Sequence, residues 1–216
     1  MPASHPLAPK QARSRQTAER ITAAALALLE RKSFAELSVQ EIARRAGVSV
    51  GGFYARFPSK HALLQYFDAT IVEGILARAG RELDSERLAG ASARTVVRTY
   101  IGLAVTAFRT HKGVLQQVAL RTRTSSDEHF KRRIREANAF LHGRFRALLK
   151  ERRSEIAHPD PDLAVDLGLT FVSAAMREYV LFAEFRPDFR PVKDGRLVRE
   201  LTDAFCAYLR IEGERE

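Results

Sequence analysis

Cationic side chains are concentrated in the first 60 residues of this 216-residue chain. Residues 1–60 hold ten Lys or Arg against four Glu, a net charge of +6, whereas the other 156 residues share the remaining +4 of the total of +10. Binding to a phosphate backbone requires a local excess of this kind. Charge alone leaves a second interpretation open, in which these residues form a basic surface that contacts only solvent.

Residues suited to catalysis or metal binding show no such grouping. None of the six histidines has a partner at metal-ligand spacing, and the chain has neither a glycine-rich phosphate loop nor a nucleophile elbow. The single cysteine, Cys206, lies among Phe205 and Tyr208, so we expect a small buried hydrophobe in a reducing compartment. The sequence argues against an enzyme, and we expect neither metal nor cofactor.

Apolar residues recur at three- and four-residue spacing along nearly the whole chain, and no segment alternates as a strand does. Helices are predicted at about 14–32, 39–45, 50–57, 60–83, 95–110, 114–121, 126–152, 161–184 and 195–211. The expected N-caps include Ser38, Ser49, Ser125 and Asp160. The prediction is therefore an all-α fold of about nine helices. No run of 18 apolar residues and no apolar block in residues 1–13 occur, so we expect a soluble, cytoplasmic protein.

The segment 38–57 has the pattern of a helix-turn-helix, two short helices that cross steeply about a three-residue turn. Ala43 provides the small residue where the two backbones approach, and Gly47 provides a turn residue that tolerates positive φ. Ile42, Val48 and Phe53 provide a shared core. An ordinary hairpin of two helices has the same features, so this pattern alone leaves both interpretations open.

A longer stretch of sequence resembles the DNA-binding signature of the TetR family of bacterial regulators. The resemblance covers about 50 residues, and its strongest elements are Ile42-Ala43, Ala46-Gly47-Val48-Ser49, Gly51, Phe53-Tyr54, Phe57 and Ser59-Lys60. It implies a flexible basic arm at 1–13, a three-helix DNA-binding domain at 14–60, and a larger helical bundle for ligand binding and dimerisation at 61–216.

The resemblance implies a role for each residue of the DNA-binding surface. Tyr54 and Lys60 match positions that hold phosphates, and the hydroxyls and helix starts at Ser38 and Ser49 suit the same task. The positions that face base edges are those of Gln40, Val50, Gly51, Gly52 and Arg56. Arg56 suits guanine and Gln40 suits adenine. Two adjacent glycines leave the middle of the recognition helix without side chains, so DNA shape is expected to contribute to recognition.

In the family the last two helices form a dimer contact, and the sequence supports this by apolar residues on all sides of residues 163–185. Phe171, Met176, Phe182, Leu197, Leu201, Phe205 and Leu209 are expected to exceed what one bundle can cover. A helix buried at the centre of its own domain is the alternative interpretation.

An effector cavity is implied by the resemblance, and six residues of the middle helices are candidates for its lining: Phe108, His111, Phe140, Arg144, Met176 and Arg177. Each also has an ordinary role, such as core packing for the aromatic side chains. The expected function is a dimeric repressor that leaves a palindromic operator in double-stranded DNA when a small molecule binds. A nucleoid-binding or scaffold protein without an effector is the other class left open, and a core without a cavity would favour it.

Overall fold

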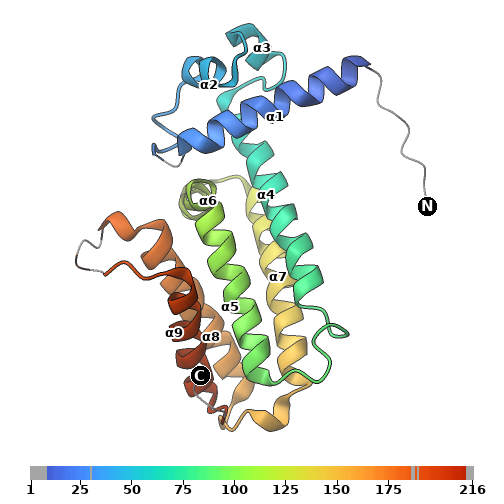
Figure 1. Cartoon of the computed structure of the whole chain (residues 1–216), viewed down its shortest axis with the longest axis vertical. Helices are drawn as coiled ribbons and strands as arrows, with labels where there is room; N and C mark the ends of the chain where they lie inside the picture. Colours follow the sequence, from blue (N-terminus) through green and yellow to red (C-terminus); the bar gives the residue numbers. More distant parts are fainter. Residues whose placement is uncertain (1–8, 30, 186–187, 189, 213–216) are drawn as a thin grey trace. The chain divides into compact units, whose positions relative to one another are not determined.

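The computed structural model of the chain describes residues 9–29, 31–185, 188 and 190–212. These residues form nine α-helices and no β-sheet, which confirms the predicted all-α fold (Figure 1). The chain divides into two compact units, residues 1–70 and 71–216, and the division falls inside the fourth helix. The boundary predicted at residue 60 lies at the first residue of that helix. No helix among the described residues is long and apolar enough to cross a membrane.

The N-terminal unit contains α1 (Pro9–Leu29), α2 (Val39–Ala46), α3 (Val50–Tyr54) and the first part of α4 (Lys60–Glu82). Its core is made by fully buried side chains from all four helices, among them Ile21, Ile42, Phe53 and Leu63. Helix α1 begins at Pro9 and not near Ser14, because a proline is well suited to the first helical position, where its missing N–H costs nothing. The flexible arm was predicted for residues 1–13, of which 1–8 lie outside the described residues.

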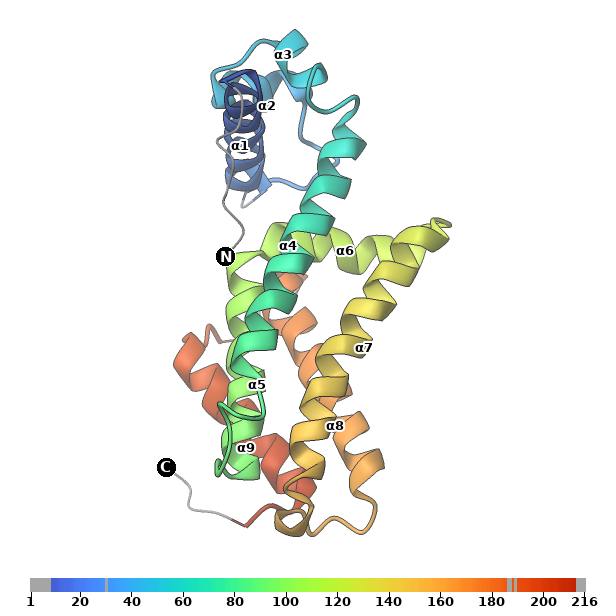
Figure 2. The same cartoon turned by 90° about the vertical axis from the view of Figure 1, so that its right-hand side faces the viewer.

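The C-terminal unit contains the rest of α4 together with α5 (Ala93–Thr110), α6 (Lys112–Thr124), α7 (Glu128–Lys150), α8 (Pro161–Met176) and α9 (Asp194–Leu209). Figure 2 shows α6 running across the end of this bundle, between the end of α5 and the start of α7. Because α6 lies across the bundle axis, α5 and α7 are held apart at that end.

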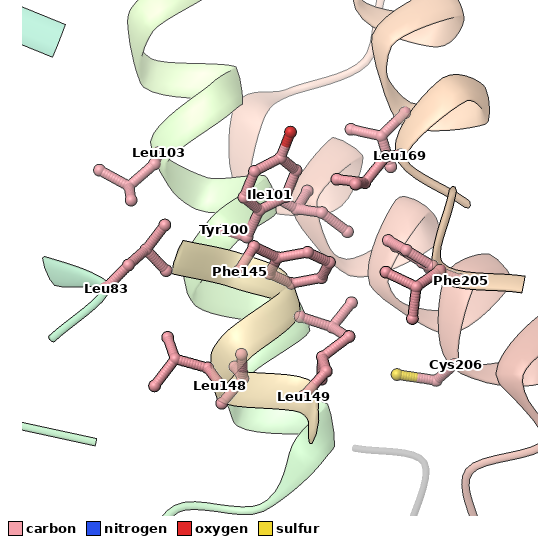
Figure 3. Close-up of a cluster of buried hydrophobic side chains, with 14 of the residues drawn as sticks. Leu83, Tyr100, Ile101, Leu103, Phe145, Leu148, Leu149, Leu169, Phe205 and Cys206 are labelled. Atoms are coloured by element: carbon pink, nitrogen blue, oxygen red, sulfur yellow. The ribbon is translucent and has the colours of Figure 1, made fainter. Parts of the chain in front are cut away.

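The core of the C-terminal unit is built around aromatic contacts between three helices (Figure 3). The ring centroids of Tyr100 on α5 and Phe145 on α7 lie 4.4 Å apart, and those of Phe145 and Phe205 on α9 lie 5.9 Å apart. Gly168 on α8 makes room for Phe205, since a Cβ there would lie 1.7 Å from a ring carbon. The thiol of Cys206 is free and buried beside this cluster, as predicted.

Further helix boundaries differ from the prediction, those of α3, α7 and α8 for visible structural reasons. Helix α3 ends at Tyr54 and not at Phe57, and the chain continues as a turn. Helix α7 is capped by Asp127 and not by Ser125, because the Asp127 carboxylate accepts from the N–H of Phe130 at 3.0 Å and is also held by Arg121. Helix α8 ends at Met176 and not near Glu184. It widens into a π-helical segment, Arg177–Leu181, since the N–H of Phe182 donates to the carbonyl of Arg177 five residues back.

Candidate functional site

Two short helices and a three-residue turn form the predicted helix-turn-helix of the N-terminal unit. Ser38 caps α2 by accepting from the N–H of Glu41 at 3.1 Å, and Ser49 caps α3 by accepting from the N–H of Gly52 at 2.9 Å. Both predicted N-caps are confirmed. The Glu41 carboxylate does not reach back to cap α2 but forms an ion pair, in which it accepts from Lys32 Nζ at 2.8 Å.

The turn between the helices depends on Gly47, which has φ +63° and ψ +40°. This left-handed conformation costs an L-residue about 1–2 kcal/mol. Its carbonyl also accepts a hydrogen bond of 2.6 Å from Arg20 Nη2 on α1, and a Cβ at Gly47 would lie 2.6 Å from that same nitrogen. The positive φ is what requires glycine at this position, since the end of the Arg20 side chain could move away from a Cβ.

Four predicted DNA contacts lie on one exposed stretch of α2 and α3. Gln40 and Gly51 are exposed, and the side chains of Val50 and Tyr54 are 38% and 49% exposed. Gly52 is half-buried against its own cap, since a Cβ there would lie 3.2 Å from Ser49 Oγ. This surface offers an amide, a phenol, a small apolar group and bare backbone, which are suitable partners for phosphates and base edges.

Arg56 and Lys60, also predicted to contact DNA, already have partners within the N-terminal unit. Arg56 Nε donates to the carbonyl of Ser14 at 2.8 Å, and its Nη2 donates to the Ser14 hydroxyl. Lys60 Nζ donates to the carbonyls of Phe34, Ala35 and Leu37 at 2.9, 3.2 and 2.8 Å, and lies 4.9 Å from the centroid of the Phe34 ring. In this conformation Arg56 joins α3 to α1, and Lys60 joins the start of α4 to the loop before α2.

The apolar residues of α8 and α9 divide into a buried set and a set that reaches the surface. Four residues that the sequence analysis assigned to the dimer contact are instead buried within their own unit and cannot form it: Met176, Leu197, Phe205 and Leu209. The second set, which we call the α8–α9 face, combines exposed residues (Leu163 and Phe171 on α8, Ala204 on α9) with half-buried ones (Leu167 on α8, Leu201 and Tyr208 on α9). Leu163 and Phe171 are 51% and 54% exposed, and the rings of Phe171 and Tyr208 join the two helices at 5.4 Å.

A cavity of about 520 Å³ lies within the C-terminal unit, between α4, α5, α6, α7, α8 and the π-helical segment. Four of the predicted effector residues line it: Phe108, His111, Met176 and Arg177. Phe140 and Arg144 do not. The side chain of Phe140 is 43% exposed, and Arg144 donates to the carbonyls of Leu83 and Gly80, with its guanidinium 5.7 Å from the Phe140 ring. The α7 residues of the cavity are instead Ile134, Ala137, Asn138, Leu141 and His142.

Most of the cavity lining is apolar, and its polar side chains include two imidazoles, the Tyr100 phenol, the Asn138 amide, several hydroxyls and three guanidinium groups. Burial lowers the pKa of His111, and burial followed by the nearby Arg146 lowers the pKa of His142. Both imidazoles are therefore neutral at neutral pH, when each offers one N–H donor and one acceptor. Burial raises the pKa of Tyr100, which keeps its phenol protonated.

Arg20, Ser14 and His142 are site residues that the sequence analysis missed. Arg20 and Ser14 act through contacts that span 27 and 42 residues of sequence. No local pattern marks such contacts. His142 and the predicted Phe140 lie two positions apart on α7, and helical spacing gives both a place on the helix without telling which of them faces a cavity.

Two family models match the chain and together span most of both units. The model described as "Bacterial regulatory proteins, tetR family" matches residues 21–67, and the model described as "Tetracyclin repressor-like, C-terminal domain" matches residues 92–209. The second match alone covers more than half of the chain.

Similar proteins are regulators as well. The HTH-type transcriptional regulator EthR of Mycolicibacterium smegmatis is 28% identical over 185 residues, which cover 84% of this chain and 81% of that one. YerO of Bacillus subtilis, an uncharacterised HTH-type transcriptional regulator, is 35% identical over 96 residues, but the match covers 44% of this chain and only 32% of that protein.

Solved structures of the same fold include a regulatory protein in the tetR family from Rhodococcus, with a TM-score of 0.70 at 16% identity over 91% of this chain and 98% of that one. The regulator FadR of Bacillus subtilis, solved in complex with stearoyl-CoA, has a TM-score of 0.61 at 18% identity over 88% of this chain and 96% of that one. At these identities the likeness concerns the fold alone.

Proposed function

The chain belongs to the TetR family of bacterial DNA-binding transcriptional regulators, and from this premise we propose that it is a dimeric repressor that leaves a palindromic operator when a small-molecule effector binds. The observation that carries the proposal is the helix-turn-helix with its exposed Gln40, Val50, Gly51 and Tyr54 beside two capped helix starts. Family membership supports a regulator over an enzyme.

The proposed DNA contacts are Ser38, Gln40, Ser49, Val50, Gly51, Gly52, Tyr54, Arg56 and Lys60. Tyr54 and the two serines would hold phosphates, while Gln40 and Val50 would read base edges. To donate to DNA with the same N–H groups, Arg56 and Lys60 would break their hydrogen bonds to carbonyl and hydroxyl oxygens of the protein and form hydrogen bonds to DNA oxygens instead. This exchange is reasonable for a phosphate, because an anionic acceptor forms the stronger hydrogen bond.

A second copy of the chain is the proposed partner of the α8–α9 face. Leaving apolar surface in water costs about 25 cal/mol per Å², and Leu163 and Phe171 are more than half exposed. Two identical chains that pair through one face are related by a two-fold axis. Such an axis would place two recognition helices about one DNA turn apart, roughly 34–36 Å or somewhat more, which suits a palindrome. A regulator of chromosomal DNA acts in the cytoplasm, at the nucleoid.

The cavity of about 520 Å³ favours an effector over a nucleoid-binding or scaffold protein without one. Ligand cavities commonly measure about 300–1,000 Å³ and have an apolar lining with a few polar groups. An effector that prefers a conformation with wrongly spaced recognition helices would release the DNA, and the same coupling free energy would appear in both affinities.

The test is a titration of fluorescent duplexes with the purified full-length chain. We expect a palindrome from the DNA that flanks the coding region to bind at least about 10³ times more tightly than an unrelated duplex. Affinity for both should fall steeply as salt rises, because bound phosphates release counterions. Equal affinity for the palindrome and the unrelated duplex would contradict the proposed function.

A further inference from the structure

The charged side chains that line the cavity of the C-terminal unit all carry positive charge. Arg78 on α4, Arg123 on α6 and Arg177 in the π-helical segment line it, and no Asp or Glu of the described residues does. A binding site selects ligands of opposite charge. We propose that the cavity takes an organic anion with an apolar body, and that Arg177 binds the anionic group. This inference rests on the proposed function, in which the cavity holds the effector, and adds the sign of the effector's charge.

Two carboxylates on neighbouring elements, Glu82 and Glu184, are engaged outside the lining. Glu82 accepts from Arg78 Nε at 2.6 Å, so Arg78 contributes little net charge to the cavity. Glu184 accepts from Gln116 Nε2 at 3.0 Å and lies 3.5 Å from Lys112 Nζ, and these two partners hold it. The positive charge that remains available to a ligand therefore comes from Arg123 and Arg177.

Arg177 differs from Arg78 in that its side chain has no partner among the described residues. Its side chain is half-buried and, within the described part of the chain, forms neither a hydrogen bond nor an ion pair. A cation partly withdrawn from water without a partner raises the free energy of the folded protein, and an anion beside it lowers that free energy again. Arg123 also has no side-chain partner among the described residues, but it is exposed and loses less by remaining unpaired.

The backbone at Arg177 gives a second, independent reason. Arg177 opens the π-helical segment, in which one extra residue per turn changes the directions of the side chains relative to α8. Single π-helical turns occur frequently at functional sites. The extra residue costs stability, so such a turn is retained mainly where it serves a function. Three residues of this stretch line the cavity: Met176, Arg177 and Leu181. The segment thus places one cation between two apolar side chains, the arrangement that a ligand with an anionic end and an apolar body requires.

The other polar groups of the lining fit the same ligand without adding charge. His111 and His142 are kept neutral by burial, so each can donate one N–H to an anion or accept from a hydroxyl. Residues from α5 and α6, among them Leu103, Phe108, Leu115 and Val118, form apolar walls for the body of the ligand.

The experiment compares three probes of equal chain length and different charge: decanoate, 1-decanol and decyltrimethylammonium. Each is titrated into the full-length protein without DNA, by isothermal titration calorimetry. We expect decanoate to bind at least about tenfold more tightly than the other two, as one charge-assisted hydrogen bond would give. Arg177→Gln should weaken decanoate binding about tenfold and leave 1-decanol unchanged, while Arg177→Lys should retain most of the preference.

Arg81→Gln is the matched control, because it removes the same charge from α4 at an exposed position outside the lining. Equal binding of 1-decanol or decyltrimethylammonium, no binding of decanoate, or an equal effect of Arg81→Gln would overturn the inference. Release of operator DNA is measured separately. A neutral compound that fills the cavity and releases the DNA would overturn the charge assignment alone, whereas a protein that binds decanoate but no palindrome would overturn the proposed function.

Discussion

The guanidinium of Arg56 is bound to Ser14, a residue 42 positions earlier on α1, through both the backbone carbonyl and the hydroxyl of that serine. A bidentate contact to guanine needs two adjacent guanidinium N–H groups, and two nitrogens of Arg56 are engaged here. The edge of the guanidinium that carries Nε and Nη2 is therefore occupied by α1, and contact with guanine through this edge would compete with the contact to Ser14.

Arg56→Ala should lower the affinity for the operator by about 1–3 kcal/mol and relax the preference at one base pair. Ser14→Ala, which removes only one competing acceptor, should leave the base preference intact. Both variants are measured against a set of operators with single base-pair changes. An equal loss on every duplex would show that Arg56 does not read a base and acts on a phosphate or by positioning α1.

Lys60→Ala should reduce the stability of the N-terminal unit as well as DNA binding. The variant removes the shared donor of the Phe34, Ala35 and Leu37 carbonyls. The bonds to Phe34 and Leu37 are partly buried, and each such carbonyl left unpaired costs about 1–3 kcal/mol, whereas the exposed carbonyl of Ala35 can bond to water. Denaturant unfolding followed by circular dichroism measures this effect. Unchanged stability with weakened DNA binding would mean that Lys60 serves only as a phosphate contact.

The two glycines of the helix-turn-helix should respond in opposite ways to alanine. Gly47→Ala should destabilise the protein by about 1–2 kcal/mol because of the positive φ at this position. Gly51→Ala should stabilise α3 by up to about 0.5–1 kcal/mol, since a Cβ there meets only Ser49 Oγ at 3.9 Å.

Operator affinity then separates folding from recognition at these glycines. If the backbone at Gly51 lies close to the DNA, Gly51→Ala binds the operator more weakly although it is the more stable protein. An operator affinity equal to that of the wild type would contradict a close approach at this position.

Phe171→Glu with Leu163→Glu should convert the proposed dimer to a monomer. Both side chains are more than half exposed on the α8–α9 face, so the substitutions oppose pairing without disturbing the core. Light scattering should give about twice the protomer mass of 24.3 kDa for the wild type and that mass itself for the variant. Leu120→Glu is the control, because Leu120 is 44% exposed on α6, outside that face. A wild type that is already monomeric would refute the dimer.

Stability should fall as the pH drops below about 6.5. Burial lowers the pKa of His111 and His142 in the folded protein. Between the folded-state pKa and the unfolded-state pKa of each histidine, the unfolded chain therefore binds more protons than the folded protein. The free energy of unfolding therefore decreases through that interval and levels off below it. Denaturant unfolding between about pH 8 and pH 5 measures the slope, which His142→Gln with His111→Gln should reduce. An unchanged slope would assign the effect to other groups.

The sequence was sufficient where structure depends on neighbours along the chain. Ser38, Ser49 and Gly47 were assigned correctly because capping and positive φ depend on spacing within a few residues. Contacts across the fold were not accessible in this way. Periodicity marked both Met176 and Phe171 as apolar, but the first is buried in the core and the second lies on the surface, and only packing of the whole unit distinguishes them. The π-helical segment was missed because an apolar pattern continues through it unchanged.

The single thiol at Cys206 makes it possible to measure how often the core of the C-terminal unit opens. Its side chain is 2% exposed, so a thiol reagent cannot reach the sulfur while the core is closed. Burial also raises the pKa of the thiol to about 11, so the reactive thiolate does not form at neutral pH. Every modification event must then follow an excursion that exposes Phe205 and its neighbours. Because the sequence has one cysteine, the rate of thiol labelling reports only these openings of the core. A change in the labelling rate when a ligand is added therefore measures how far the ligand suppresses the openings.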